Sequence, residues 1–280
     1  MTVLVTGATG TVGSAVRATL EGRNVQTRAG VRSPATTEFE AQTVAFDYTK
    51  PETWGAALES VEAAFLMFPP GVTPSRVTEF ADAAVRTGVE RLVFLSVLGA
   101  DKLPVIPHRR IERQLETVEA DTTALRAAYF MQNLSDVHGP EIRERDELFV
   151  PAGDGRLGFV DARDVGAVAA ALLTGACRTA RSAVTLTGPE ALGFETAATV
   201  FTEQLDREIT YPNPSRRAFA RRMYERGLSP GFVLFMLAEY QATRFGLTDR
   251  TTETVATLLN REPNALAAFV ADYREQFRSR

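Results

Sequence analysis

Short apolar runs alternate with segments of helical periodicity along most of the chain. Apolar runs bounded by turn residues are typical of buried strands, and apolar positions repeating every three to four residues are typical of helices packed on a sheet. The expected strands are Thr2–Thr6, Val25–Val31, Thr43–Phe46, Ala63–Phe68, Arg91–Val97, Thr123–Ala127 and Ala183–Thr187. The expected helices between them are Ser14–Leu20, Trp54–Ser60, Arg76–Thr87, His108–Ala120 and Val165–Leu173. This alternation predicts an α/β fold built on a doubly wound parallel sheet.

The last third of the chain has a different pattern, in which helical periodicity continues with a single short strand, Ile209–Tyr211. The expected helices are Phe194–Leu205, Ser215–Arg226, Gly231–Phe245 and Pro263–Phe277. Upstream, Leu148–Val150 and Leu157–Val160 flank two glycines and predict a β-hairpin, followed by a helix that Asp161 or Asp164 caps. We expect residues 1–188 to form the sheet domain and residues 189–280 a smaller, mainly helical cap that closes over the ligand edge of the sheet.

The expected cap contains aromatic and methionine side chains that permit two interpretations. They could line a pocket for an apolar substrate, or they could form the core of the helical region, which is the more common role of such residues at helical spacing. The residues concerned are Phe219, Met223, Tyr224, Phe232, Phe235, Met236 and Tyr240.

Composition narrows the function classes. The 280 residues are 45% hydrophobic with a formal net charge of -4, so we expect a large core and no broad basic field for direct nucleic-acid binding. Cys177 is the single cysteine, which excludes a disulfide framework and favours a reducing cytoplasmic setting. No apolar stretch reaches the length of a membrane span, and no signal peptide is expected. The two histidines and the scattered acids have no metal-binding spacing.

A glycine-rich loop follows the first expected strand and carries the first functional signal. Gly7, Gly10 and Gly13 are spaced three residues apart, between that strand and the first helix. Residues without a Cβ let the backbone approach a pyrophosphate, and the helix N-terminus directs free N–H groups at it. We expect phosphate contacts from Gly7, Thr9, Gly10, Thr11, Val12 and Gly13, with the Thr6, Thr9 and Thr11 hydroxyls as further donors. The alternative is a tight turn that binds nothing.

Four segments together resemble the NmrA-like branch of the atypical short-chain dehydrogenase/reductase superfamily. They are Val5–Gly13, Leu92–Ala100, Leu125–Asn133 and Phe159–Val165, and the helical end of the chain is similar as well. The resemblance implies a Rossmann fold that binds NAD(P). The family includes NADP-dependent quinone and dye reductases and also nucleotide-sensing regulators without catalysis.

The end of the second expected strand favours NADP over NAD. An NAD-specific site places a carboxylate there for the ribose 2′-hydroxyl, whereas this strand ends in Arg32 and Ser33, with no acid. A guanidinium and a hydroxyl suit a 2′-phosphate, and Arg28 could add a second charge. The alternative for Arg32 is a solvated loop arginine.

Further cofactor contacts follow from the resemblance and the fold. Asp47 resembles the acid that contacts adenine in the family, although it could equally be a plain turn residue. Phe68 and Pro69 end the fourth expected strand, and ligands bind beyond the carboxyl ends of such strands. They are therefore expected beside the nicotinamide ribose.

The catalytic residues are less clearly marked. Standard superfamily members pair a strand-end serine with Tyr-x-x-x-Lys, and neither lysine of this chain follows a tyrosine at that spacing. Ser96 occupies the serine position as a catalytic and cofactor-binding candidate, and His108 stands where the tyrosine is expected. His108 could protonate a carbonyl oxygen, with Arg109 favouring its neutral form, or it could be an ordinary packing residue. The family pattern places Tyr129, Phe130 and Asn133 beside the nicotinamide as substrate contacts.

Two function classes remain open. The first is an NADP(H)-dependent reductase that passes hydride to a small apolar quinone, ketone or aromatic acceptor, for which correct positioning alone could supply most of the rate. The second is a non-catalytic NADP(H)-sensing protein that binds a protein partner. We expect a monomer or a homodimer in either case.

Overall fold

The computed structural model describes residues 1–34 and 42–278, which form two compact units. Unit 1 comprises Met1–Ala127, Ala162–Leu186 and Thr254–Glu262. Unit 2 comprises Ala128–Asp161, Thr187–Glu253 and Pro263–Arg280. The units interleave along the chain, so the boundary expected at residue 188 separates them only in part.

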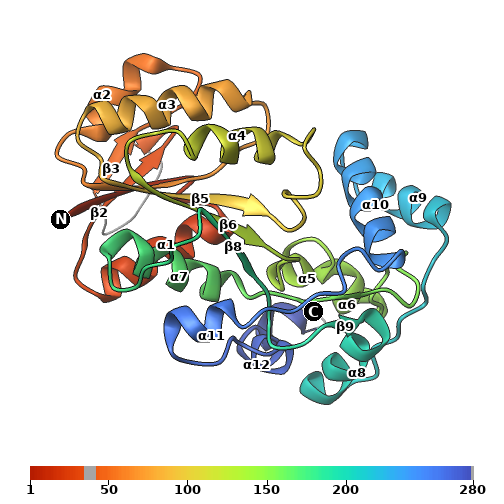
Figure 1. Cartoon of the computed structure of the whole chain (residues 1–280). Coiled ribbons are helices and arrows are strands. Elements are labelled where there is room, and N and C mark those ends of the chain that lie inside the picture. Colours follow the sequence, from red (N-terminus) through yellow and green to blue (C-terminus); the bar gives the residue numbers. More distant parts are fainter. Residues whose placement is uncertain (35–41, 279–280) are drawn as a thin grey trace. The chain divides into compact units, whose positions relative to one another are not determined.

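Unit 1 is built on a seven-stranded parallel sheet with the strand order β3-β2-β1-β4-β5-β6-β8 (Figure 1). The strands are β1 (Thr2–Thr6), β2 (Gln26–Val31), β3 (Gln42–Ala45), β4 (Ala63–Leu66), β5 (Arg91–Val97), β6 (Asp121–Ala127) and β8 (Ala183–Leu186). β1, β4 and the middle of β5 are almost entirely buried, as expected for strands covered on both faces. The doubly wound α/β fold predicted from the sequence is therefore confirmed.

Helices cover both faces of this sheet (Figure 1). The helical elements of unit 1 are α1 (Thr11–Gly22), the short 3-10 helix η2 (Pro51–Thr53), α2 (Trp54–Leu58), α3 (Pro74–Arg86), α4 (Pro107–Leu115), α7 (Ala162–Thr174) and α11 (Thr254–Leu259). On one face, α2, α3 and α4 enclose an aromatic core around Phe80, which packs edge to face with Phe46, Tyr48 and Trp54. On the other face, α1 and α7 pack closely, since a Cβ at Gly166 would lie only 2.7 Å from that of Ala15.

The strand order reverses between β1 and β4, which places the switch point of the sheet at these two neighbouring strands. β2 and β3 lie on one side of β1, and β4, β5 and β6 extend the sheet on the other side. In sheets of this kind, ligands bind beyond the carboxyl ends of the strands at the switch point. Gly7, directly after β1, and Met67, directly after β4, mark that place.

Unit 2 is mainly helical. Its helices are α5 (Gln132–Asp136), α6 (Gly139–Arg145), α8 (Phe194–Leu205), α9 (Arg216–Glu225), α10 (Pro230–Arg244), α12 (Leu266–Asp272) and α13 (Arg274–Phe277). Two short antiparallel strands, β7 (Arg156–Leu157) and β9 (Leu192–Gly193), complete it. Its core is aromatic, with Phe194, Phe201, Phe219, Tyr240 and Phe269 all at most 1% exposed. Tyr273 separates α12 from α13, where a single helix was expected.

The predicted hairpin in this unit is wrong. Leu148–Val150 forms no strand, because all three side chains are buried in the core instead of alternating between two faces. Arg156 and Leu157 pair with Gly193 and Leu192, far along the chain, rather than with the preceding segment. The strand expected at Ile209–Tyr211 is reduced to one bridge between Glu147 and Thr210. Throughout residues 1–34 and 42–278, no helix has the length and apolar character needed to cross a membrane.

Candidate functional site

The glycine loop lies at the switch point of unit 1, between β1 and α1. Gly10 is the N-cap of α1 without a side-chain hydrogen bond, and the Gly10 N–H donates to the Gly7 carbonyl at 2.9 Å. The first helical hydrogen bond runs from the Ser14 N–H to the Gly10 carbonyl at 2.8 Å. Among the described residues, the three preceding N–H groups, of Thr11, Val12 and Gly13, therefore have no intramolecular acceptor, as is usual at a helix start.

Two glycines of this loop are required by its geometry. Gly7 has a φ of +61°, a conformation that side chains disfavour, and an added Cβ would overlap the Met67 sulfur at 2.0 Å. A Cβ on Gly13 would lie 2.1 Å from the Gly7 carbonyl oxygen. The loop is thereby held tight against the start of α1, with Thr9, Gly10 and Thr11 exposed to solvent. An exposed helix N-terminus with unpaired N–H groups fits a phosphate.

Thr6 does not contribute to this surface, which corrects the expectation from the sequence. Its side chain is fully buried, and its hydroxyl donates to the Phe65 carbonyl at 2.9 Å while lying 3.1 Å from the Tyr48 hydroxyl. The Met67 N–H also donates to it, at 3.2 Å. Thr6 therefore ties β1 to β4 below the loop, and only Thr9 and Thr11 have exposed side chains there.

The end of β2 presents Arg32 and Ser33, both exposed. Arg28 is wrongly predicted as a second phosphate-binding charge, because its guanidinium is buried and Nη1 donates to the carbonyls of Ala56, Ala57 and Glu59 at the end of α2. A cation at the C-terminus of a helix complements the helix dipole, which explains its placement. Arg32 is therefore left as the cationic candidate from β2.

Asp47 lies in a turn after β3. Its Oδ1 accepts hydrogen bonds from the Thr49 N–H at 2.8 Å and from the Thr49 hydroxyl at 2.7 Å. These bonds lower the pKa of the carboxyl, with smaller contributions from the charges of Lys50 and Arg32. This geometry is that of a turn residue, one of the two interpretations of Asp47, while contact with adenine stays a prediction.

Phe68 and His108 meet at the same edge of the sheet. Phe68 and Pro69 follow β4 and are half-buried, and the Phe68 ring packs at right angles to the His108 ring with centroids 5.4 Å apart. The Phe94 ring lies on another side of His108, at 6.1 Å. Burial against these rings lowers the pKa of His108, and the Glu112 carboxylate acts in the opposite direction. Burial, rather than the charge of Arg109 invoked from the sequence, therefore favours the neutral imidazole.

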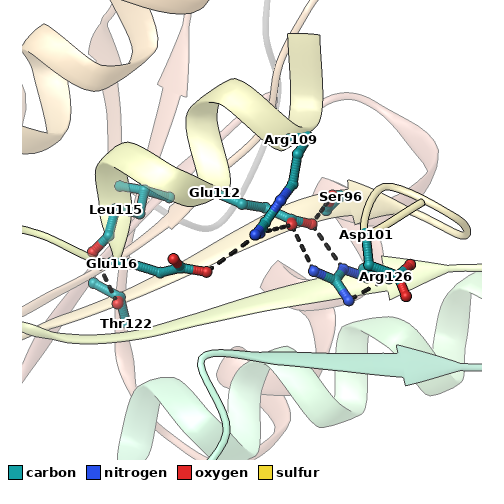
Figure 2. A network of polar contacts seen from close by, with 8 residues as sticks. All are labelled: Ser96, Asp101, Arg109, Glu112, Leu115, Glu116, Thr122 and Arg126. Carbon is teal, nitrogen blue, oxygen red and sulfur yellow. Dashed lines mark hydrogen bonds and ion pairs between the residues drawn. The ribbon is translucent and has the colours of Figure 1, made fainter. Parts of the chain in front are cut away.

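Ser96 belongs to a buried ionic network (Figure 2). The Ser96 hydroxyl donates to Glu112 Oε1 at 2.6 Å, so its proton is directed at a carboxylate. Arg126 clamps the same carboxylate with two bonds, from Nε to Oε1 at 3.0 Å and from Nη2 to Oε2 at 2.7 Å. Arg109 donates to Oε2 at 3.0 Å, and Asp101 and Glu116 lie at the two ends of the network.

The strand register explains why these side chains meet. Ser96 on β5 is directly opposite Arg126 on the parallel neighbour β6, so both side chains lie on the same face of the sheet, which α4 covers. Glu112 is 2% exposed, and burial alone would raise its pKa. The hydrogen bonds from Arg126, Ser96 and Arg109 outweigh burial and hold the pKa below its ordinary value, so the carboxylate is charged at neutral pH. Sequence reasoning missed Glu112 and Arg126.

The three predicted substrate residues lie in unit 2. Tyr129 is 7% exposed, and its hydroxyl lies 3.1 Å from that of Tyr240 in the aromatic core. Phe130 is half-buried beside its backbone bridge to Val160, and Asn133 is half-buried at the start of α5. The Tyr240 hydroxyl contacts His138 Nε2 at 2.6 Å, which supplies the partner for His138 that the sequence did not reveal. The substrate roles of these residues stay predictions.

The aromatic and methionine set of the expected cap divides into two groups. Phe219, Met223, Met236 and Tyr240 are buried in the core of unit 2. Tyr224, Phe232 and Phe235 are 49%, 40% and 60% exposed, and the last two rings stack on the surface of α10. Within the part of the chain that the structure describes, no three His, Cys, Asp or Glu side chains are grouped so that they could hold a metal ion.

Comparison with known proteins places this geometry in a family. The chain is 30% identical over 275 residues to the uncharacterized oxidoreductase YesF of Bacillus subtilis, covering 96% of this chain and 94% of the relative. It is 34% identical over 220 residues to the NAD(P)H azoreductase of Xenophilus azovorans, covering 75% and 76%. The crystal structure of the NADPH-dependent quinone oxidoreductase QOR2 of Escherichia coli, complexed with NADPH, superposes with a TM-score of 0.84 at 26% identity, covering 98% of this chain and all of the other. The profile of the NmrA-like family matches residues 1–270, and the chain belongs to this family.

Proposed function

We propose that the chain is an NADP(H)-dependent reductase that transfers hydride to an apolar quinone, ketone or aromatic acceptor. The observation that carries the proposal is the free N-terminus of α1, framed by Gly7, Gly10 and Gly13 at the switch point of the sheet. The azoreductase relative and the NADPH-bound quinone oxidoreductase support the same assignment.

Each part of the cofactor has candidate partners in unit 1. The N–H groups of Thr11, Val12 and Gly13 would hold the pyrophosphate, and Phe68 with Pro69 would border the nicotinamide ribose. Arg32 and Ser33 would hold the 2′-phosphate, since a guanidinium binds phosphate oxygens through forked hydrogen bonds. When bound, the cofactor supplies a hydride from its reduced nicotinamide ring.

Calorimetry with NADPH and NADH tests the cofactor assignment. The Arg32→Ala variant should lose about tenfold or more in affinity for NADPH, because a charge-assisted hydrogen bond to the 2′-phosphate is removed, and little for NADH. Arg86→Ala, which removes an exposed arginine of α3, is the matched control and should leave both affinities unchanged. If wild-type protein binds NADH as tightly as NADPH, the NADP assignment is wrong.

An open groove of about 600 Å³ lies in unit 2, partly within the region 189–280 that was expected to bind substrate. Charged side chains form much of its lining, including those of Asp154, Arg156 and Glu190. Phe194 also borders the groove, but its side chain is fully buried and stacks on Tyr211, with centroids 5.8 Å apart. The volume is within the range of small-molecule sites, but this lining does not favour an apolar acceptor, so the proposed acceptor class rests on the relatives.

The non-catalytic alternative is favoured by one observation, the absence of Tyr-x-x-x-Lys at Lys50 and Lys102. A turnover assay with NADPH and a panel of naphthoquinones, ketones and azo dyes separates the two functions. Oxidation of NADPH that depends on the acceptor supports the reductase. Tight NADPH binding without turnover of any acceptor, together with a protein partner that binds in only one nucleotide state, supports the sensor.

A further inference from the structure

The inference concerns the pair formed by His108 and Glu112 and rests on the proposed reductase function. The two residues are four apart on α4, a spacing that places their Cβ atoms about 5–6 Å apart on one face of the helix. His108 is half-buried against Phe68, the residue that follows β4 at the switch-point edge. Its ring therefore adjoins the cofactor edge of unit 1 and stays accessible to solvent protons.

The charge next to His108 is fixed in position. Glu112 is 2% exposed and is held by Ser96, Arg126 and Arg109, so its carboxylate can neither rotate away nor become fully hydrated. A buried charge acts on its neighbours with little screening by salt or solvent. The carboxylate therefore offsets part of the effect that burial has on the His108 ring.

We propose that Glu112 is the positioning residue for proton transfer by His108. Its fixed carboxylate reduces the cost that burial places on the protonated imidazole, the form that donates to the acceptor oxygen as hydride arrives. When bound, the reduced cofactor would supply the hydride, which would form a new C–H bond on the acceptor and leave the nicotinamide oxidised by two electrons. The imidazolium gives its proton to the acceptor oxygen, which forms an O–H bond, and His108 then regains a proton from solvent.

Other charged groups near His108 lie on α4 and the neighbouring strand. Arg109 and Arg126 are both bonded to Glu112 and partly neutralise it, and Asp101 lies 3.7 Å from Arg126. On α3, which packs against α4, Arg76 and Glu79 form their own exposed pair. The net charge near His108 therefore depends on Glu112 and its two arginines. Substituting Glu112 makes this charge more positive, and substituting either arginine makes it more negative.

The experiment is an NMR titration of His108 in the full chain without cofactor. With only two histidines in the sequence, His108→Asn identifies the signal by its loss. Glu112→Gln removes the negative charge and should lower the pKa of His108 by about one unit, whereas Arg126→Gln removes a positive charge that partly neutralises Glu112 and should raise this pKa by a smaller amount. Glu116→Gln removes an exposed carboxylate of the same helix region and should cause no comparable shift.

The expected pKa shifts of His108 have opposite signs in the two variants, which distinguishes an electrostatic effect from general damage to the fold. Both Glu112→Gln and Arg126→Gln leave a buried charge without its partner, so both are expected to destabilise the protein. A general disturbance would shift the His108 pKa in the same direction in both, and this result would overturn the proposal. If Glu112→Gln does not fold, Arg126→Gln still tests the proposal. Without Arg126 the Glu112 carboxylate is less neutralised, so the pKa of His108 should rise, and an unchanged pKa would overturn the proposal.

The second readout is the pH dependence of kcat for NADPH oxidation by a 1,4-naphthoquinone. The rate should fall as pH rises through the pKa of His108, and this limb should move to lower pH in Glu112→Gln and to higher pH in Arg126→Gln. His108→Asn should remove the limb. If the enzyme turns over but its pH profile is unchanged by all three substitutions, this inference alone is overturned. If the wild type binds NADPH without turnover, the proposed function is overturned.

Discussion

Acidification should destabilise unit 2 through one buried histidine. His138 is fully buried, with Nε2 2.6 Å from the Tyr240 hydroxyl. Its Nδ1 has no hydrogen-bond partner among the described residues. Burial, with a smaller contribution from the Arg226 guanidinium, lowers the pKa of His138 from its ordinary value of 6.5 to about 3. The folded protein therefore keeps this ring neutral under conditions in which the unfolded chain protonates it.

The sign and size of the effect follow from this difference. Between about pH 6.5 and pH 3 the unfolded chain binds more protons than the folded chain, so stability falls as pH falls through that window. Each pH unit of the difference is worth about 1.4 kcal/mol. At about pH 4.5, His138 alone should lower the free energy of unfolding by about 3 kcal/mol, rising to about 5 kcal/mol once the pH lies below the folded-state pKa.

Urea unfolding followed by circular dichroism measures this loss. Wild type and His138→Gln are compared at about pH 7 and about pH 4.5, and the difference between their losses cancels every other titrating group. Glutamine cannot titrate but retains a polar group near Tyr240. The wild type should lose about 3 kcal/mol more than the variant on acidification. Losses that agree within about 0.5 kcal/mol, or a His138 NMR signal that titrates above pH 5 in the folded protein, would refute the reasoning.

Two further predictions concern the glycine loop and α10. Gly13→Ala should abolish NADPH binding by calorimetry and lower the melting temperature, because its Cβ would lie 2.1 Å from the Gly7 carbonyl oxygen; unchanged binding would exclude the tight loop as the phosphate site. Glu239→Gln should stabilise the protein at about pH 8 by about 1–2 kcal/mol and have little effect near pH 5. Burial beside Tyr129 and Tyr240 raises the pKa of Glu239 to about 7, so its favourable neutral form is lost as pH rises. Equal effects at the two pH values in denaturant unfolding would contradict this.

The sequence was most informative where burial on both faces imposes a strong local pattern. β1 and β5 have the bounds expected from the sequence, because the middle of a parallel strand inside the sheet, Val3–Val5 and Leu92–Leu95 here, forms an apolar run. The glycine loop was also predicted correctly from the sequence. Gly7 has a positive φ and Gly13 has no room for a Cβ, so other residues do not fit at these positions. In the loop, the positive φ of Gly7 and the contact of Gly13 with the Gly7 carbonyl are short-range requirements, which a local sequence pattern can indicate.

Strand pairing between distant segments was harder to predict from the sequence. Leu157 resembles the second strand of a hairpin, yet it pairs with Leu192, which lies 35 residues further along the chain. Arg28 and Thr6 were assigned to the ligand side by their type and position, but each side chain points into the structure, toward the end of α2 and toward β4 respectively. A residue type can suggest chemistry, but the face on which it lies depends on register and on the element that covers it.

The pair formed by His108 and Glu112 is an intermediate case. His108, Ile111, Glu112 and Leu115 have the i, i+3, i+4, i+7 spacing of the buried stripe of a helix, so the sequence places both titratable residues on the face toward the sheet. A carboxylate at such a position needs a cation beneath it. That cation is Arg126, which the parallel register sets opposite Ser96 and which lies in a strand of mixed polar and apolar residues. A charged residue on a buried helical stripe thus predicts an ionic partner on the underlying sheet, and only the strand order reveals which residue it is.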